Sequence, residues 1–347
     1  MTPMTTTRPE PTMPHRRAEL LPGIVELMEH HRRHCPEYAR ILAATGHGPG
    51  RHYAALSDVP WLPVRLFKNH VLRSVAADAV SSVLTSSGTT GTPSRIHLDA
   101  PAARAHQRAL LNTLRPVLGA RRLPMLVVDS AAQARRGATR SARAAGVLGL
   151  MNAGRDHTFV LDGDDRLDVT ALRGFLSRHG GEPFLVFGFT YLVWTRLIQP
   201  AQEAGLDLSG GILLHSGGWK RLAGQAVDAA AFREAAARAG LSRSHDFYGM
   251  VEQIGVVHVE GDEPGLLSPP EGAEVIIRDP VTWEEARPGE TGLIQVLSTL
   301  PRSYPGHSLL TEDLGVAHRV DSRTRFTVLG RLPRAEARGC SDAGVAS

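Results

Sequence analysis

The chain has 347 residues, of which 42% are hydrophobic and 21% are charged, and its net charge is only +4. These values are typical of a globular protein with a sizeable core and room for two domains. The sequence has no dense basic run with interleaved aromatic residues, so nucleic-acid binding is not expected. It also has no apolar stretch long enough to span a membrane. The two cysteines, Cys35 and Cys340, do not indicate a disulfide framework and fit a reducing cytoplasm.

The first residues of the chain predict a disordered leader followed by a helix. Residues 1–15 lack the apolar core of a signal peptide. Aliphatic residues at helical spacing then predict an amphipathic helix over residues 16–45. His30 and His34 lie one turn apart on it, but no ligand cluster completes a metal site around them. We interpret both as structural or surface histidines and expect Cys35 to be packed.

The segment 85–93 reads TSSGTTGTP and lies between two strand-like stretches. Glycine lets a backbone turn sharply and bring its N–H groups close to an anion, and hydroxyl side chains add further donors. The segment therefore predicts a phosphate-binding loop, although its composition is also typical of a solvated turn. It is not a Walker loop, because no Gly-Lys-Ser/Thr ending follows. The candidate phosphate-binding residues are Ser86, Ser87, Gly88, Thr89, Thr90 and Gly91.

Helical and strand-like segments alternate after this loop. Helices are expected over residues 101–117, 191–204 and 226–239, and buried strands over residues 125–130, 184–188 and 211–216. This alternation predicts an α/β fold with parallel strands, in which ligands gather at the carboxyl ends of the strands. A smaller β-rich subdomain is expected from about residue 272, with strand-like runs at 273–278, 292–297 and 325–329.

The candidate loop resembles the phosphate loop T-S-G-T-T-G-x-P-K of the adenylate-forming ligases, with Ser94 in place of the closing lysine. Four further stretches resemble that family's motifs and follow its order. They are HSGGWK at 215–220, FYGMVE at 247–252, TEDLG at 311–315 and Gly330-Arg331. The resemblance implies the family's large N-terminal domain, which has βαβ sheets and a small β-rich subdomain. It also implies ATP and Mg²⁺ as cofactors.

The resemblance implies an adenine site and a metal ligand. In that family a Gly-Gly segment lies against adenine, as Gly217 and Gly218 would do here, since glycine permits close approach to a flat base. An aromatic ring followed by glycine packs on the base, which matches Tyr248 and Gly249. The motif's glutamate holds Mg²⁺ beside the phosphates, which matches Glu252. Taken alone, the two glycines are also typical of a strand-to-helix turn.

The resemblance further implies a ribose site and a catalytic cation. Asp313 matches the aspartate that accepts hydrogen bonds from the ribose hydroxyls. Arg331 matches the hinge arginine that contacts ribose or phosphate, although most arginines at such a position lie on a surface. Lys220, Lys68 and Arg331 are three candidates for the positive charge near the reacting carboxylate, and the sequence does not choose among them. The expected acyl pocket consists of Phe187, Gly188, Phe189 and His215, with Tyr191 and Trp194 nearby.

Ordinary adenylate-forming ligases continue past the hinge into a mobile C-terminal domain, whereas this chain ends at Ser347. This ending, and residues 60–68, resemble the acyl-protein synthetase component of bacterial bioluminescence fatty-acid reductases, over about residues 20–341. In that family a cysteine near the C-terminus takes the acyl group from acyl-AMP as a thioester and passes it to a partner reductase. Cys340 matches this cysteine, and nearby arginines such as Arg338 would favour its thiolate. The alternative is an inert terminal cysteine.

The sequence thus predicts a disordered leader over residues 1–15, an adenylate-forming catalytic domain over 16–331 and a tail over 332–347. We expect ATP-dependent activation of a carboxylic acid, by resemblance a fatty acid, then capture on Cys340 and delivery to a reductase. One alternative is transfer to coenzyme A or to a carrier protein, as in phenylacetate-CoA-type ligases. A second is a non-catalytic nucleotide- or acyl-binding partner, which Ser94 and the short C-terminus favour.

Overall fold

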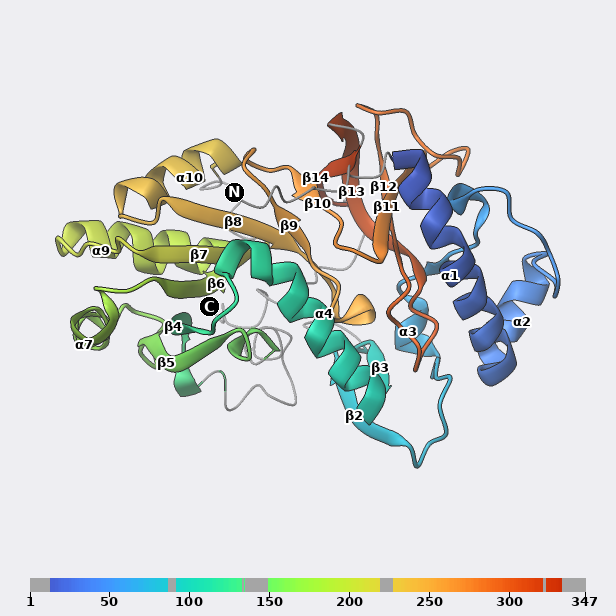
Figure 1. Ribbon diagram of the computed structural model, residues 1–347, viewed down its shortest axis with the longest axis horizontal. Coiled ribbons are helices and arrows are strands. Elements are labelled where there is room, and N and C mark those ends of the chain that lie inside the picture. The colour runs from blue at the N-terminus through green and yellow to red at the C-terminus, as the bar shows by residue number, and fades with distance from the viewer. Residues whose placement is uncertain are drawn as a thin grey trace, which may run out of the picture.

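The computed structural model describes residues 13–86, 92–132, 134, 149–218, 227–320 and 323–332 (Figure 1). The predicted α/β class is confirmed, because twelve of the described strands form one mixed sheet with helices packed around it. The strand order in that sheet is β11-β12-β13-β14-β10-β9-β8-β7-β6-β4-β5, and the short strand β1 (Leu62–Pro63) pairs in parallel with β13. A separate two-stranded sheet holds β2 (Val80–Thr85) and β3 (Arg95–Asp99).

One half of the large sheet is parallel and the other is antiparallel. The parallel strands are β4 (Leu123–Ser130), β5 (Gly154–Leu161), β6 (Phe184–Phe189), β7 (Gly211–Ser216) and β8 (Arg243–Tyr248). The antiparallel strands are β9 (His258–Glu260), β10 (Leu267–Ser268), β11 (Ala273–Arg278), β12 (Thr291–Ser298), β13 (Ser308–Val320) and β14 (Arg323–Arg331). The antiparallel half includes the strands that the sequence predicts from about residue 272, but antiparallel pairing already begins with β9, and these strands continue the same sheet.

The helices surround this sheet. They are α1 (Met13–His34), α2 (Pro36–Ala44), α3 (Leu66–Asn69), α4 (Ala100–Leu118), α7 (Val169–His179), α8 (Thr190–Leu192), α9 (Gln199–Glu203) and α10 (Ala229–Arg238). In Figure 1, α7, α9 and α10 accompany the parallel strands, and α1 and α2 lie at the opposite end of the molecule beside β11 and β12. No helix among the described residues is both long and apolar enough to cross a membrane.

Two predicted helices differ from the observed ones. The helix expected over 16–45 is interrupted at Cys35, because Pro36 restricts the residue before it to extended backbone and starts a new helix. Cys35 is buried, as expected, and burial raises the pKa of its thiol. The helix expected over 191–204 consists of α8, a π-helical stretch over Val193–Ile198 and α9.

Two hydrophobic cores share one helix, α4. One core surrounds the parallel strands and includes Leu114 and Leu118 from the C-terminal half of α4. The other packs α1 and α2 against the antiparallel strands and includes Ala102 from the first turn of α4. Figure 1 shows α4 running from the β2–β3 hairpin toward the parallel strands. The helix that leaves the predicted phosphate loop therefore connects both halves of the molecule.

Aspartate side chains begin three of the helices. Asp99, Asp168 and Asp228 each accept a hydrogen bond from the backbone N–H three residues later, at 2.9, 2.9 and 2.7 Å. An N-cap of this kind satisfies a donor that has no partner within the helix and is worth about 1 kcal/mol. The Asp99 cap fixes the start of α4 immediately after β3, at a short distance along the chain from the candidate phosphate loop.

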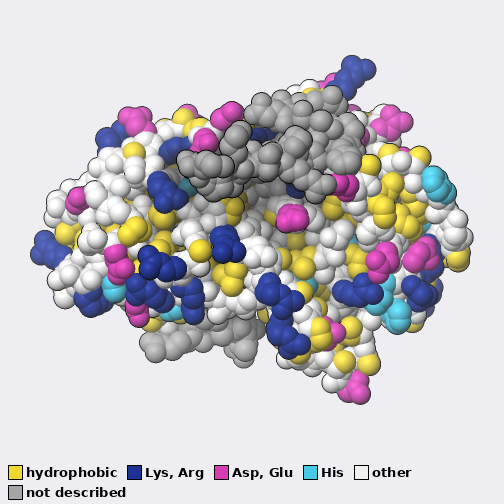
Figure 2. Space-filling model, viewed as in Figure 1, with side chains coloured by type: hydrophobic (Ala, Val, Ile, Leu, Met, Phe, Trp, Pro, Cys, Tyr) yellow, Lys and Arg dark blue, Asp and Glu magenta, His cyan; other side chains and the backbone are white. Residues whose placement is uncertain are grey.

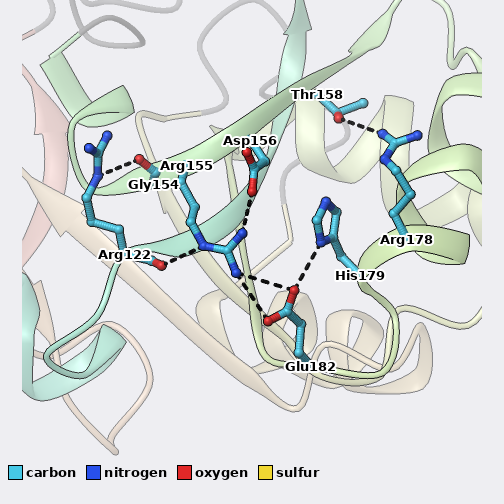
Figure 3. Close-up of polar contacts among 8 residues, drawn as sticks. All are labelled: Arg122, Gly154, Arg155, Asp156, Thr158, Arg178, His179 and Glu182. Carbon is cyan, nitrogen blue, oxygen red and sulfur yellow. Dashed lines mark hydrogen bonds and ion pairs between the residues drawn. The ribbon is translucent and has the colours of Figure 1, made fainter.

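An arginine-rich network closes the edge of the parallel sheet at the amino ends of its strands. Arg155 donates to the Arg122 carbonyl at 3.2 Å and to Glu182 at 3.2 Å, and His179 contacts the same carboxylate at 3.0 Å (Figure 3). Figure 2 shows Lys and Arg side chains gathered on this face where β4, β5 and α7 lie. Ligands of such sheets bind at the carboxyl ends of the strands. We therefore interpret this network, at the amino ends, as stabilising the fold and not as part of a ligand site.

Buried histidines should make the protein sensitive to mild acid. Burial lowers the pKa of His215, His258 and His307 to about 3, from an ordinary value of 6.5. The unfolded chain therefore binds protons that the folded chain excludes, so stability falls as the pH drops below about 6.5. Each histidine should cost about 2 kcal/mol by pH 5. Urea unfolding of the wild type and of His307→Gln at pH 7 and pH 5 should show a smaller acid effect in the variant. An equal effect in both would contradict this assignment.

Candidate active site

The predicted motif segments meet at the carboxyl ends of the parallel strands. Gly217 and Gly218 directly follow β7, and Tyr248 ends the neighbouring strand β8. These strands are in register, with Ser216 opposite Phe247. The two segments therefore lie side by side, although 30 residues separate Gly218 from Tyr248 in the sequence. This is the edge where the α/β pattern predicts a ligand.

One carboxylate joins the parallel and antiparallel halves at this edge. The Tyr248 hydroxyl donates to Asp313 Oδ2 at 2.7 Å, and Arg331 Nε donates to Asp313 Oδ1 at 3.1 Å. Asp313 on β13 lies opposite Arg331 on β14, next to a β-bulge that bends the strand pair. Burial and the adjacent Asp313 raise the pKa of Tyr248, so its hydroxyl stays protonated and donates. A carboxylate offers about four acceptor positions, so two are left for a ligand.

Glu252 lies beside this network in a 3₁₀ turn over Val251–Gln253 and is 6% exposed. Burial raises the pKa of its carboxyl, whereas the Ser94 side chain and the Arg331 guanidinium oppose the rise. Ser94 is the residue that replaces the closing lysine of the loop motif, and it is fully buried. The structure thus puts a hydroxyl, where the motif has an ammonium group, next to the carboxylate predicted to bind the metal.

The candidate phosphate loop closes at Ser86 and Ser94. The Ser86 N–H donates to the Ser94 carbonyl at 3.2 Å, and the Ser94 N–H donates to Ser86 Oγ at 2.9 Å. These bonds continue the β2–β3 pairing by one step beyond Thr85 and Arg95. The neck of the loop is therefore a strand pair. The predicted residues Ser87, Gly88, Thr89, Thr90 and Gly91 lie outside the described residues.

A cavity of about 180 Å³ lies next to Gly217 and Gly218. His215 and Asp246 line it, and the Asp246 carboxylate is 3.7 Å from His215 Nδ1. His215 Nδ1 is also 2.9 Å from the Thr190 hydroxyl. Because its pKa is low, this histidine is neutral and its ring can share a hydrogen bond with that hydroxyl. His215 therefore belongs to the same cavity as the two glycines.

Asp246 is a candidate site residue that the sequence analysis missed. It lies two residues before Tyr248 on the same strand, so the two-residue period of a strand puts both side chains on one face. The Asp246 side chain is 38% exposed, and partial burial and the nearby Glu260 carboxylate raise the pKa of its carboxyl. The Asp246 N–H donates to Glu260 at 2.8 Å, and Arg233 pairs with Glu260 at 3.2 Å. The strand period could have identified Asp246, whereas Glu260 and Arg233 meet it only in the tertiary structure.

Three of the predicted acyl-pocket residues belong to a packed layer. Phe187 and Phe189 are 1% and 3% exposed, and Phe187 stacks with Phe247 at a centroid distance of 6.4 Å. A Cβ on Gly188 would lie 2.7 Å from Val128 Cβ and 2.8 Å from Val193 Cγ2. Gly188 is therefore required for close packing between β4 and the π-helical stretch. Phe187 and Phe189 alternate with Gly188 along β6, and Gly188 pairs with His215, so the two phenylalanine rings lie on the opposite face of the sheet from His215.

The structure describes two of the three candidate cations. Arg331 is tied to Asp313 and its charge acts on Glu252. Lys68 lies on α3. Arg65, three residues before it, forms an ion pair at 2.9 Å with Glu312, which directly precedes Asp313. Lys220 lies outside the described residues, as does Cys340. The contacts and charge of Arg331 reach both the predicted ribose position and the predicted metal position.

Several solved structures share this fold. One is 2-hydroxyisobutyryl-CoA ligase in an open conformation with 2-HIB-AMP and CoA, at 18% identity and a TM-score of 0.71, covering 92% of this chain and 71% of that one. The ATP-bound MatB of Rhodopseudomonas palustris matches at 20% identity and a TM-score of 0.50, and the match covers 74% of this chain and 49% of that one. The anthranilate CoA ligase AuaEII in complex with anthranoyl-AMP matches at 18% identity and a TM-score of 0.51. The match covers 74% of this chain and 48% of that one. No curated protein matches the sequence significantly.

These likenesses define the fold as that of the adenylate-forming ligases, as the motif order predicts. The family itself follows from a sequence match, because the model of the acyl-protein synthetase family LuxE covers residues 13–345. The chain therefore belongs to the LuxE family of acyl-protein synthetases and is a ligase. The match also includes the region that carries Cys340.

Proposed function

We propose that this protein activates a carboxylic acid with ATP and then carries the acyl group on Cys340. One arrangement supports the activation of the acid with ATP. Tyr248 and Arg331 both donate to Asp313, and this group lies beside Glu252 and near the cavity at Gly217 and Gly218. Four segments that are distant in sequence supply these residues, and they follow one another in the order of the family's motifs. A carboxylate oxygen attacks the α-phosphorus, the bond to the β-phosphate breaks, and acyl-AMP and pyrophosphate form.

The cavity next to Gly217 and Gly218 suits the adenine base. Its exocyclic amine is a donor, and the Asp246 carboxylate in the cavity wall is an acceptor. Tyr248 and Gly249 would lie against the base, and the two oxygens of Asp313 would accept bonds from the ribose hydroxyls. A Cβ on Gly249 would lie 3.3 Å from the Val256 carbonyl oxygen and 3.3 Å from Val257 Cγ1, so the glycine allows this turn to pack closely on residues 256–257.

The phosphates would lie between the candidate loop and Glu252. Glu252 fits Mg²⁺, because it is a buried oxygen donor whose negative charge is opposed nearby by the Arg331 guanidinium and would be stabilised further by a cation. No group of three or more metal-binding side chains occurs in the described part of the chain, so phosphate oxygens and water would complete the shell. Bound Mg²⁺ would neutralise charge on the phosphate oxygens. Arg331, Lys220 and Lys68 are the candidates for additional positive charge.

The acid would bind at the carboxyl ends of β6 and β7, where Gly188 and the neutral His215 lie on one face of the sheet and Phe187 and Phe189 lie on the other. We propose a fatty acid as the substrate class, as the resemblance to the acyl-protein synthetases implies. Cys340 then attacks the acyl carbon as a thiolate, a C–S bond forms and AMP leaves. A reducing compartment such as the cytoplasm would keep this thiol free. A partner reductase would receive the acyl group and form the aldehyde.

Acid-dependent exchange of labelled pyrophosphate into ATP tests the first step. Exchange with a fatty acid is expected, and its complete absence with all acids tried would favour the non-catalytic binding role. A thioester on the protein tests the second step, because neutral hydroxylamine releases it. Direct transfer to coenzyme A or a carrier protein would instead give a labelled product without labelled enzyme.

Asp313→Ala should mainly weaken ATP binding. Hydrogen bonds to a charged group are worth about 1.5–3 kcal/mol, so we expect the KM for ATP to rise roughly 10- to 100-fold. The turnover number should change less, since ribose contacts act equally in the ground and transition states. Steady-state exchange kinetics at varied ATP would measure this. Asp162→Ala, which removes a carboxylate that caps an exposed turn, is the matched control. An unchanged KM in Asp313→Ala would refute the ribose assignment.

A further inference from the structure

His106 joins α4 to the turn that carries Glu252. This side chain is 3% exposed, and its Nδ1 contacts the Ile254 carbonyl, two residues after Glu252. A carbonyl oxygen only accepts hydrogen bonds, so Nδ1 carries the proton and donates. Burial lowers the pKa of His106, which fits a neutral ring. One hydrogen bond thus ties the backbone of the turn to the helix.

The same turn packs directly on the backbone of α4. Gly255 has φ +81°, a conformation that favours glycine. A Cβ at Gly255 would lie 2.7 Å from the His106 carbonyl oxygen and 2.8 Å from its Cα. The turn therefore lies as close to the helix as a backbone without a side chain permits, and its distance from α4 is set at His106.

The turn also contacts the connection between β12 and β13. Gln253 donates to the Gly306 carbonyl at 3.0 Å, and a Cβ on Gly306 would lie 2.9 Å from the Glu252 carbonyl oxygen. Tyr304 from this connection is fully buried and stacks with the His106 ring at a centroid distance of 6.2 Å. The Glu252 turn is thus held between this connection and α4.

These contacts relate the metal carboxylate to the phosphate loop. The loop, β3 and α4 follow one another without a gap in the chain, so α4 is the rigid element that leaves the loop. Mg²⁺ tolerates little variation in its ligand distances, so a carboxylate and phosphates that share one ion must be held at a constant separation. His106 is the side chain of α4 that binds the carboxylate turn.

We infer that His106 is a positioning residue that holds the Glu252 turn at a set distance from β3 and from the Ser86–Ser94 pair at the neck of the candidate phosphate loop. This inference rests on the proposed function, since it needs Glu252 to bind Mg²⁺ beside the phosphates. His106 Nε2 is buried and has no hydrogen-bond partner among the described residues. A buried unpaired acceptor costs free energy, so packing alone would be served better by an apolar side chain. The Nδ1 donor to the turn is the specific contribution of the histidine.

Three substitutions separate the donor from the bulk of the side chain. His106→Asn keeps an N–H near the position of Nδ1, His106→Gln moves it toward the position of Nε2, and His106→Leu removes it. We expect the Mg²⁺ concentration for half-maximal pyrophosphate exchange to rise about 10-fold in the Leu and Gln variants, as for other residues that orient metal ligands. The Asn variant should stay within about 3-fold of the wild type. Calorimetric titration of the full chain with ATP, with and without Mg²⁺, should show the same order without catalysis.

His157→Leu is the matched control. His157 lies on β5, the edge strand of the parallel half, and its Nε2 contacts the Met151 carbonyl at 2.8 Å, outside the candidate site. We expect this variant to lower the melting temperature without changing the Mg²⁺ requirement. If the Leu variant of His106 does not fold, the Asn and Gln variants alone decide, and equal Mg²⁺ dependence in those two would overturn the inference. A normal Mg²⁺ requirement in Glu252→Gln would instead overturn the metal assignment in the proposed function.

Discussion

Cys340→Ser should abolish the labelled acyl-protein that the wild type accumulates from labelled acid and ATP. The step from acyl-AMP to protein needs a nucleophile, and a thiol is a few per cent ionised at neutral pH, whereas a hydroxyl is essentially not. Adenylation precedes this step, so the variant should still make acyl-AMP and pyrophosphate. Gel-based detection of labelled protein, together with pyrophosphate exchange on the same samples, would separate the two steps.

The second cysteine of the chain provides the control for this experiment. Cys35 is buried between α1 and α2, and burial raises the pKa of its thiol, so it is a poor nucleophile. Cys35→Ser should therefore label like the wild type, and neutral hydroxylamine should release that label as it releases other thioesters. Labelling of Cys340→Ser at the wild-type rate would show that the tail does not take part. Direct transfer to coenzyme A or a carrier protein would then be the better interpretation.

Glu252→Gln should lower acid-dependent pyrophosphate exchange by roughly 100-fold or more. The substitution keeps the size of the side chain but removes the charge that the proposed Mg²⁺ site needs, and charge stabilisation by the metal is worth several kcal/mol. Because burial raises the pKa of Glu252, the neutral glutamine should not destabilise the turn. Exchange measured over a range of Mg²⁺ concentrations would show whether excess metal restores part of the rate.

Glu274→Gln is the matched control for Glu252→Gln. Glu274 is 1% exposed, burial raises the pKa of its carboxyl as well, and it lies on β11 near Arg17. It shares the burial and charge of Glu252 but lies outside the candidate site. We expect exchange in this variant within about 2-fold of the wild type, even if its stability falls by the 1–3 kcal/mol typical of a lost buried contact. Exchange that survives in Glu252→Gln would mean that another carboxylate binds the metal.

The buried strands of the parallel sheet were predictable from the sequence. β7 has the predicted bounds 211–216, and β4 and β6 differ from prediction by one or two residues at their ends. Runs of apolar residues at these positions are buried on both faces, so local composition carries the signal. The 13-residue strand β13 was not predicted, because its residues 311–315 (TEDLG) are polar and glycine-containing. Pairing with β12 and β14 on both sides overrides that weak local preference.

The candidate site was predictable as a set of motifs but not as a set of contacts. Glu252, Asp313 and Arg331 were proposed as site residues because short residue patterns occur in a family's order. The pairing of Tyr248 with Asp313 depends on strands that are 65 residues apart, and no local pattern encodes it. His106 carries no motif at all, since it lies within a regular helix and matters only through the turn packed against it.

By itself, the sequence determined the α/β class, the order of the nucleotide motifs and the family, because each depends on local composition and short-range spacing. The tertiary structure decided which side chains share charge and hydrogen bonds. It placed Ser94 and Arg331 against Glu252, and Asp246 in the cavity beside Gly217 and Gly218. Such contacts depend on the register of strands and on the packing of one helix across two cores. Those are long-range properties, which are settled only when the whole chain has buried its apolar surface.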